Sequence, residues 1–513
     1  MENKKQHLFA LVLGTTIAIN NSFGENNQSA DQSKKKRPNI IFLMDDQHRY
    51  DAIGLLNKNV ITPTLDSLIS HGVLYTEAVC QAPMSVASRN SMMTGLYPNQ
   101  IGILRNEPGI SEDKLPSKPI FEVLRDAGYE TAGFGKTHWG LDTESTRGFE
   151  TRYEAECREN GAIMMVDVDA EKYKKYNEEV KSFGPGEEDN AGYIGLTSAL
   201  NENEHRDGWL TEKCIDYVRE RKDDRPLFLY LSFFKPHAGN NILPKFESMY
   251  DLEKIPYAIQ PPWDKDYSPH AEGVNRRKIY EGFWKTASVN DWKTMTMRYY
   301  ANCTWMDDMF GRVLSELKTK GVLDNAIIVY LTDHGEMLGD RYYRFNKYCL
   351  YDGSVRVPIV ISGSALPAKL SGKKDSRPAE LVDIYPTLLN IAGVEAPKAL
   401  PGINLLSNQK RSGNFCSLYE RAGEAAFMWR TKDFKLILCF KRKKDVTQYS
   451  VDDIINGEFY DLKKDPREWN NCFKAAKYKK VREQMRDNLL EHLKKIGKLS
   501  PGAVAITAYQ RSK

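Results

Sequence analysis

Residues 83–95 read Pro83-Met84-Ser85-Val86-Ala87-Ser88-Arg89-Asn90-Ser91-Met92-Met93-Thr94-Gly95, and the rest of the chain is organised around them. Ser85 stands where the N-cap of a helix is expected, and Gly95 stands where that helix would stop. Arg89 follows one turn after Ser85 and shares its face. A hydroxyl nucleophile at a helix N-terminus, with a guanidinium beside it, favours an anionic ligand. For these residues alone, a capped helix whose arginine faces water is the competing interpretation.

The composition bounds the class of protein. The 513 residues are enough for one large α/β domain and a smaller one. Hydrophobic residues make up 41% and charged residues 28%, which is an ordinary globular composition. The net charge of +4 is small for this length, so nucleic acid is not expected as a partner. The cysteines form no C-x-x-C pair, so a zinc site is not indicated.

The N-terminus resembles an export signal. The apolar run from Leu8 to Ile19 follows two lysines and is too short to span a bilayer. Ser22-Phe23-Gly24 offers small residues at the positions that a signal peptidase reads, so we expect a signal peptide over residues 1–24. Residues 25–36 are polar and predict a flexible leader. Together these features predict an exported, periplasmic protein of bacterial type without stable membrane insertion. A disordered N-terminus is the alternative.

Acidic side chains follow two apolar runs that have the pattern of buried strands. Residues 38–44 are followed by Asp45-Asp46, and residues 326–331 are followed, after Thr332, by Asp333 and His334, which are also metal-type ligands. Ligands bind at the carboxyl ends of parallel strands, and adjacent carboxylates there repel unless a cation neutralises them. Bringing the two ends together makes a mainly oxygen-donating set that suits Ca²⁺ or Mg²⁺. Its members are Asp45, Asp46, Asp333 and His334.

Basic side chains follow the other strands. Residues 130–134 predict a short strand that delivers Lys136 and His138, which point the same way if the backbone stays extended. The apolar run at residues 226–234 leads to His237, and Lys347 lies between the last buried strand and the next apolar run. Taken singly, such residues are more often solvated loop positions.

The C-terminal part has a different pattern. Residues 415–420, 426–430 and 434–440 predict short strands close in sequence, hence an antiparallel sheet. Residues 478–496 predict a basic amphipathic helix, which we expect to pack rather than to bind a membrane. We therefore expect a catalytic domain over residues 37–405 and a subdomain over residues 406–513. Residues 150–207 and 256–293 are polar or irregular, and we expect them to be insertions that shape a pocket.

In chain order, these segments resemble the formylglycine-dependent sulfatases of the alkaline phosphatase superfamily, from Pro38 to Glu468. The family signature C/S-x-P/A-S-R, followed by T-G, reads here Ser85-x-Ala87-Ser88-Arg89 and then Thr94-Gly95. The chain has Ser where Cys is commoner, and Ala where Pro is commoner. Residues 135–140 match the family's G-K-x-H-x-G segment, and Lys347 with Arg356-Val357-Pro358 matches its K…RVP segment. The Ser form is similar to bacterial type I sulfatases matured by an anaerobic radical-SAM enzyme.

The resemblance implies a fold and an activity. The fold would be α/β and alkaline-phosphatase-like: a large mixed sheet flanked by helices, with a smaller C-terminal α+β subdomain built on an antiparallel sheet. The activity would be hydrolysis of sulfate monoesters, with sulfated carbohydrates as substrates. Ser85 would be converted to formylglycine (3-oxoalanine), and the bound ion would be Ca²⁺, with Mg²⁺ as the alternative.

The resemblance also implies a role for each site residue. Arg89 would steady the hydrated aldehyde, and Lys136 and Lys347 would bind sulfate oxygens. His237 would protonate the leaving oxygen, and His138 would assist at the second hydroxyl of the nucleophile. The metal ligands would be Asp45, Asp46, residue 85, Asp333 and His334.

Two other functions are compatible with the same residues. A phosphoesterase or phosphonate hydrolase of this superfamily would use Ser85 without modification, because a serine phosphate can be cleaved at phosphorus. A catalytically silent glycan-binding protein is the alternative from another class. The identity of the sugar, the position of its sulfate, exo or endo action, disulfide pairing and oligomeric state are not readable from the sequence.

Overall fold

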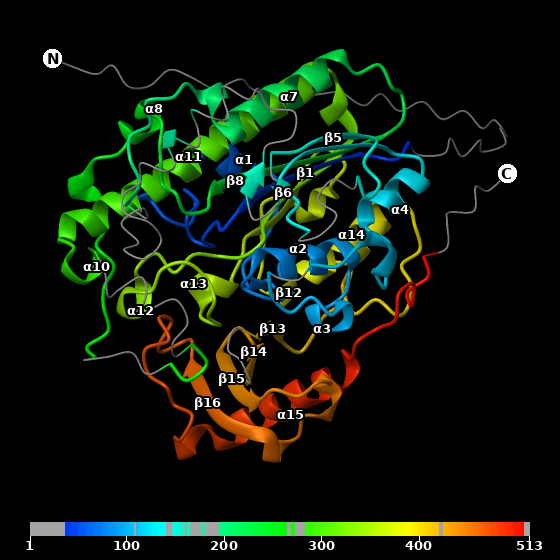
Figure 1. Cartoon of the computed structure of the whole chain (residues 1–513). Helices are drawn as coiled ribbons and strands as arrows, with labels where there is room; N and C mark the ends of the chain where they lie inside the picture. Colours follow the sequence, from blue (N-terminus) through cyan, green and yellow to red (C-terminus); the bar gives the residue numbers. More distant parts are fainter. Residues whose placement is uncertain are drawn as a thin grey trace, which may run out of the picture. The chain divides into compact units, whose positions relative to one another are not determined.

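An eight-stranded mixed sheet lies at the centre of residues 37–513 in the computed structural model (Figure 1). The structure describes residues 36–106, 109–139, 146–155, 157–159, 162–164, 175, 178–179, 194–263, 268–271, 283–419 and 424–506. The signal peptide predicted over residues 1–24 lies outside them. The strand order is β11-β2-β10-β9-β1-β8-β4-β5. Their bounds are β11 (Lys373–Asp375), β2 (Val73–Tyr75), β10 (Ile359–Ser362), β9 (Ala326–Thr332), β1 (Asn39–Asp46), β8 (Leu227–Pro236), β4 (Glu130–Gly135) and β5 (Thr151–Tyr153).

The middle of this sheet is parallel, which decides where the site forms. β1 pairs in parallel with β9 on one side and β8 on the other, and β8 pairs in parallel with β4. The carboxyl ends of these four strands therefore meet at one edge, as the sequence predicts. β10 is antiparallel to β9, so the sheet is mixed, which confirms the predicted fold class. β5 also pairs with β4, so the chain after residue 150 begins with a strand of the sheet rather than with an insertion.

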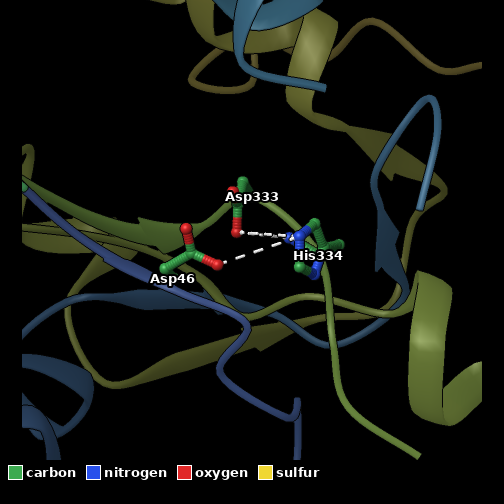
Figure 2. Close-up of side chains that lie close together, drawn as sticks. All are labelled: Asp46, Asp333 and His334. Carbon is green, nitrogen blue, oxygen red and sulfur yellow. Dashed lines mark hydrogen bonds and ion pairs between the residues drawn. The ribbon is translucent and has the colours of Figure 1, made fainter. Parts of the chain in front are cut away.

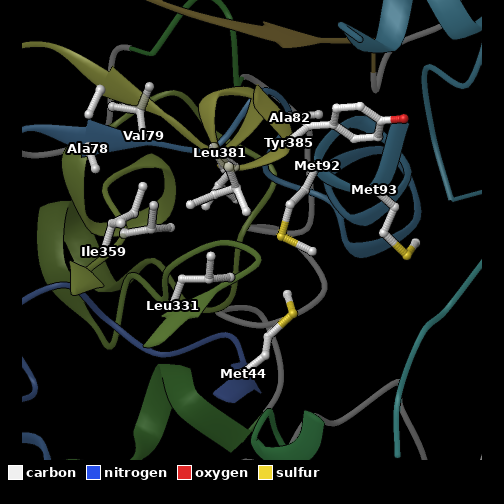
Figure 3. Close-up of a cluster of buried hydrophobic side chains, with 14 of the residues drawn as sticks. Met44, Ala78, Val79, Ala82, Met92, Met93, Leu331, Ile359, Leu381 and Tyr385 are labelled. Atoms are coloured by element: carbon white, nitrogen blue, oxygen red, sulfur yellow. The ribbon is translucent and has the colours of Figure 1, made fainter. Parts of the chain in front are cut away.

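Helices cover both faces of the sheet, and β1 shows why. Ile40, Phe42 and Met44 pack on one side with α2 (Ser85–Thr94), α4 (Ile120–Asp126) and α14 (Ile384–Ile391). Ile41 and Leu43 pack on the other with α1 (Pro63–Ser70), α7 (Arg206–Glu220) and α11 (Val289–Thr319). Figure 3 shows Met92 of α2 near Met44 in this cluster. Burial of each such side chain contributes about 1.5–3 kcal/mol. α2 is buried along its whole length, so its arginine does not face water.

The sequence predicts helices over residues 210–221 and 294–320, and both begin earlier in the structure. α11 starts at Val289 rather than at Thr294, because Ser288 caps it: Ser288 Oγ accepts from the amide of Asp291 (3.2 Å), and the Asp291 carboxylate accepts from the amide of Ser288 (2.7 Å). α7 starts at Arg206 rather than at Leu210. Short elements connect the layers: β3 (Ala78–Val79), α3 (Pro98–Ile101), β6 (Cys157–Glu159), β7 (Ala162–Met164), α8 (Pro244–Glu247), α10 (Phe283–Thr286), α12 (Asp340–Tyr343), α13 (Asp352–Val355) and β12 (Ala379–Glu380). Among the described helices, none combines the length and apolar character needed to cross a bilayer.

The C-terminal part is a four-stranded antiparallel sheet with one helix on it, which confirms the predicted architecture. Its strands, in order, are β13 (Asn414–Leu418), β14 (Glu424–Arg430), β15 (Phe434–Lys441) and β16 (Ile454–Asp461). α15 (Lys479–Lys495) packs against β14 and β15, with Leu489 and Leu493 buried. In Figure 1 this sheet and helix are coloured orange to red.

Buried charges join this sheet to the segment at residues 350–352. Arg430 donates to both carboxylate oxygens of Asp352, at 2.9 and 2.8 Å. Lys435 Nζ lies 2.6 Å from the same carboxylate and donates to the carbonyl of Leu350 at 3.1 Å. Tyr351 donates its hydroxyl to Glu458 of β16 at 2.8 Å. Removing one partner of such a buried pair costs about 3–5 kcal/mol, so the C-terminal sheet fixes this segment firmly.

Candidate active site

One edge of the sheet collects most of the side chains predicted for the site. β1 ends in Asp45 and Asp46, and the segment after β9 carries Asp333 and His334. Lys136 directly follows β4, and His237 directly follows β8. Ser85 and Arg89 come from α2, which packs over the same strands and contacts the residues after β9. The parallel pairing described above is what brings segments so distant in the sequence together.

Three of these residues form a group that can hold a metal ion. Asp46, Asp333 and His334 are fully buried, and each offers one ligand atom, all within 4.8 Å of one another. His334 Nε2 lies 3.9 Å from Asp46 Oδ1 and 3.7 Å from Asp333 Oδ1 (Figure 2). Asp46 Oδ1 has no hydrogen-bond partner among the residues that the structure describes. A buried carboxylate oxygen without a partner is costly, so this geometry suits a cation between the three side chains.

His334 has the protonation state that a ligand needs. Burial lowers its pKa to about 4 against the opposing effect of the Asp333 carboxylate, so the imidazole is neutral at neutral pH. Its Nδ1 lies 3.2 Å from the carbonyl of Gly335. A carbonyl only accepts, so the proton belongs on Nδ1 and the lone pair on Nε2. Ser85 Oγ donates to that Nε2 at 2.9 Å, so the Ser85 hydroxyl lies next to the group formed by Asp46, Asp333 and His334.

Asp45 has a different environment from Asp46. Its Oδ2 lies 2.6 Å from Nδ1 of His48 and accepts from the hydroxyl of Tyr330 at 3.1 Å. Its Oδ1 is buried and, within the described part of the chain, has no hydrogen-bond partner. Asp45 is not among the three residues whose ligand atoms lie mutually within 4.8 Å. Its unpartnered oxygen is compatible with metal binding, and its role as a ligand stays a prediction.

The start of α2 differs from the prediction. Met84 is the N-cap residue and Ser85 is the first helical residue, because the Ser85 hydroxyl turns to His334 instead of back to the helix amides. Asn106 Oδ1 accepts from the amide of Val86 at 3.2 Å and so satisfies one of the free amides at the N-terminus of α2. Gly95 ends the helix with a φ of 69°, as the sequence predicts.

Arg89 places a buried guanidinium next to the site carboxylates. It is fully buried, and its Nε donates to Asp333 Oδ2 at 2.8 Å. Its terminal nitrogens donate to the carbonyl of Lys136 at 2.7 Å, to Ser232 Oγ at 2.9 Å and to Asp46 Oδ2 at 3.4 Å. The planar guanidinium thus connects three strand ends and partly offsets the two carboxylates.

Two lysines add positive charge. Lys136 Nζ lies 2.5 Å from Asp46 Oδ2, and Lys347 Nζ donates to Gln47 Oε1 at 3.0 Å; both lysines are buried. Burial raises the pKa of Asp46, but the charges of Lys136, Arg89 and Lys347 outweigh it and hold that pKa well below its usual value. Burial lowers the pKa of Lys347 to about 8. Asp46 is therefore ionised, and the two lysine ammonium groups beside it could also attract an anionic group.

Two histidines predicted for the site, His237 and His138, follow β8 and β4. His237 is half-buried, and its Nδ1 lies 3.3 Å from the carbonyl of Ala238. Burial together with the charge of Lys347 lowers its pKa well below the usual value. His138 is also half-buried and follows β4. Gly135 has a φ of 91° and His138 a φ of 49°, so the backbone is not extended there. The alternation argument for Lys136 and His138 therefore does not apply, and the role of His138 stays a prediction.

Comparison with known proteins identifies the family. Residues 38–394, more than half of the chain, match the family model described as Sulfatase. The chain belongs to the sulfatase family. Residues 340–495 of this sulfatase also match the model described as N-sulphoglucosamine sulphohydrolase, C-terminal. The protein is thus an enzyme, a sulfuric ester hydrolase, as the resemblance implied.

Relatives of this sulfatase span almost its whole length. It is 28% identical to an arylsulfatase of Clostridium perfringens over 474 residues, which cover 89% of this chain and 94% of that protein. It is 26% identical to an N-acetylglucosamine-6-O-sulfatase of Bacteroides thetaiotaomicron, covering 90% and 87%. Its fold is similar to the crystal structure of a phosphonate monoester hydrolase of Agrobacterium radiobacter, with a TM-score of 0.71, 22% identity and coverage of 89% and 95%. The last likeness supports the predicted fold class.

Several polar residues of the sulfatase site were not singled out from the sequence. Gln47 and His48 follow directly after Asp45-Asp46, and Glu336 comes two residues after His334. Tyr330 lies on β9 and reaches Asp45. All four are buried, and each contacts a predicted site residue or a neighbour of one. Their position at the ends of the same two strands is the signal that could have identified them.

Proposed function

We propose that this sulfatase hydrolyses sulfate monoesters of carbohydrates, through a formylglycine made from Ser85 and with a bound Ca²⁺. The observation that carries the proposal is the contact of Ser85 Oγ with His334, inside a group that also contains Asp46 and Asp333. Lys136 and Lys347 lie close enough to this group for their positive charges to lower the pKa of Asp46. The similarity to an N-acetylglucosamine-6-O-sulfatase supports a sulfated sugar as substrate.

The residues present fit a hard divalent cation. Two carboxylates and one neutral imidazole form the core of the donor set, and the unpartnered buried oxygens of Asp45 and Asp46 are available to it. Oxygen-rich sites suit Ca²⁺, with Mg²⁺ as the alternative. Asp45, Asp46, Asp333, His334 and residue 85 would hold the ion. When bound, it would act as a Lewis acid that lowers the pKa of a nearby hydroxyl and offsets the charge of the sulfate group.

The chemistry explains why residue 85 would need modification. A serine that attacked sulfur would become a stable alkyl sulfate, and the enzyme would stall. Formylglycine, once hydrated, has two hydroxyls. One attacks sulfur as the bond from sulfur to the leaving oxygen breaks. The second hydroxyl then loses its proton, the aldehyde C=O re-forms, and the bond from carbon to the sulfate oxygen breaks and releases sulfate.

The surrounding side chains have roles that follow from their charges. Lys136 and Lys347 would bind sulfate oxygens, and Arg89 would steady the hydrate and the carboxylates beside it. His237 would protonate the leaving oxygen; sulfate bound between the lysines would offset the positive charge that lowers the pKa of this histidine. His138 would accept the proton of the second hydroxyl.

Maturation and export complete the proposal. An anaerobic radical-SAM sulfatase-maturating enzyme would oxidise Ser85, and the N-terminal signal would direct the protein to the periplasm. The segments at residues 150–207 and 256–293 would shape the sugar pocket. Several of their residues lie outside the part of the chain that the structure describes.

Mass spectrometry of the peptide that contains residue 85 tests the proposal. In protein from the native host, or co-expressed with the maturating enzyme, we expect residue 85 to be two hydrogens lighter than serine. An unmodified serine in an enzyme that turns over phosphonate or phosphate esters would favour the phosphoesterase instead. A screen of defined sulfated mono- and disaccharides with matured enzyme would then identify the sugar.

A further inference from the structure

Gln47 occupies an unusual position directly after Asp46. It is fully buried and has a φ of 66°, a left-handed conformation that residues other than glycine adopt rarely. Its backbone is held on both sides: its amide donates to Asp333 Oδ1 at 3.1 Å, and its carbonyl accepts from the hydroxyl of Tyr299 at 2.7 Å. These contacts do not involve the side chain, so they persist when the side chain is changed.

The side chain of Gln47 connects two charged groups. Lys347 Nζ donates to Gln47 Oε1 at 3.0 Å, and Gln47 Nε2 donates to Oε2 of Glu336. An ammonium only donates and a carboxylate only accepts, so these two neighbours fix which way the amide points. Only one orientation of the Gln47 amide makes both hydrogen bonds, and in that orientation its oxygen holds the Lys347 ammonium.

Glu336 also closes the loop that carries Lys347. Its Oε1 accepts from the amide of Leu338 at 2.9 Å and from the amide of Asn346. Leu338 and Asn346 have φ values of 48° and 62°, so the loop follows a path that needs such support. One oxygen of Glu336 thus holds the loop backbone, and the other holds the Gln47 amide.

We propose that Gln47 and Glu336 are positioning residues that hold the Lys347 ammonium where it meets the sulfate group. Lysine has a long, flexible side chain, and Asp46 and Asp333 attract its charge. The amide of Gln47 gives the ammonium a fixed partner and keeps it from settling on those carboxylates. This inference rests on the proposed function, in which Lys347 binds sulfate.

A pair of substitutions tests the chain of contacts. In Glu336→Gln, the retained oxygen still accepts from both loop amides, but the new NH₂ group faces the NH₂ group of Gln47. Neither amide can turn without losing another contact. We expect kcat/KM for 4-nitrophenyl sulfate to fall by about 10- to 100-fold. Adding Gln47→Glu gives the new NH₂ group an acceptor and leaves Lys347 a partner. We therefore expect kcat/KM of the double variant to recover to within about fivefold of the wild-type value.

A second cycle tests whether Gln47 acts through Lys347. Gln47→Ala should lower kcat/KM by about 10- to 100-fold in the wild-type chain, but by less than about threefold in a Lys347→Ala chain. Affinity for inorganic sulfate, measured by calorimetry, should follow the same pattern. Gln100→Ala is the matched control: Gln100 is a buried glutamine of α3 whose oxygen accepts from the amide of Tyr97 at 3.0 Å. We expect it to change kcat/KM by less than about threefold.

All measurements use the matured, Ca²⁺-loaded full chain, and thermal unfolding shows that each variant is folded. No recovery in the double variant, or an equal cost of Gln47→Ala with and without Lys347, overturns the inference. If Lys347→Ala is strongly impaired in these cases, the proposed function stands and only the inference fails. If Lys347→Ala keeps full activity, the proposed role of Lys347 fails and the inference fails with it.

Discussion

Replacing Arg89 with lysine tests whether a guanidinium is needed to hold the site together. Arg89 reaches Asp333 Oδ2 at 2.8 Å, the Lys136 carbonyl at 2.7 Å and Ser232 Oγ at 2.9 Å, in different directions. A lysine keeps the positive charge, but its single ammonium cannot reach all three acceptors. We therefore expect the loss of at least two hydrogen bonds that involve a charged group.

The expected loss of stability follows from these contacts. Each hydrogen bond to a charged group contributes about 1.5–3 kcal/mol, and breaking a buried ion pair costs about 3–5 kcal/mol. Because the site is fully buried, little solvent screening reduces these values. We expect Arg89→Lys to lower the free energy of unfolding by about 3–5 kcal/mol without Ca²⁺, and by less with Ca²⁺, which would neutralise Asp46 and Asp333.

Guanidinium-induced unfolding followed by circular dichroism, with and without Ca²⁺, measures this loss. Arg125→Lys on α4 is the control, because Arg125 is partly exposed and pairs with Asp126 at the surface. We expect it to change stability by less than about 0.5 kcal/mol. A loss below about 1 kcal/mol in Arg89→Lys, or one no larger than in Arg125→Lys, would refute the reasoning.

Three further outcomes follow from the site. His237→Ala should slow hydrolysis of sugar sulfates by about 10²- to 10⁴-fold and slow hydrolysis of 4-nitrophenyl sulfate far less. His71→Ala, at an exposed histidine, is the control, and equal losses on both esters would count against an acid role for His237. Because the pKa of Lys347 is about 8 and only the ammonium attracts an anion, affinity for inorganic sulfate should fall as the pH rises through 8; an affinity constant to pH 10 would contradict this. A chelator should lower the unfolding temperature and Ca²⁺ should restore it, whereas Asp333→Asn should lose this response; a persisting response would argue for another metal site.

Much of the fold could be predicted because its strands are buried on both faces. The continuous apolar runs at residues 38–44, 226–234 and 326–331 identify the central strands, and parallel pairing then places their carboxyl ends together. The sequence could not show that β5 joins the sheet, because three residues give too short a pattern. Nor did periodicity find the first turn of α11, whose start depends on the capping contacts of Ser288.

The candidate site was predictable by residue type and less so by contact. The order of acids, bases and one hydroxyl in the sequence identified Ser85, Asp46 and Asp333. It could not reveal that Asp45 binds His48, because that contact depends on the turn after β1. Gln47 was missed for the same reason: a lone glutamine has no spacing signal, and its importance lies in two partners that are distant in the sequence.

The contacts between the C-terminal sheet and residues 350–352 have a practical consequence. That segment comes three residues after Lys347, and its partners Arg430 and Lys435 lie on β14 and β15. A chain truncated after residue 405 would leave Asp352 with Arg356 but without Arg430 and Lys435, so we expect trimming at that point to destabilise the segment beside Lys347. Random mutagenesis that scores only turnover would also find inactive variants in this sheet, although none of its strands supplies a proposed catalytic group.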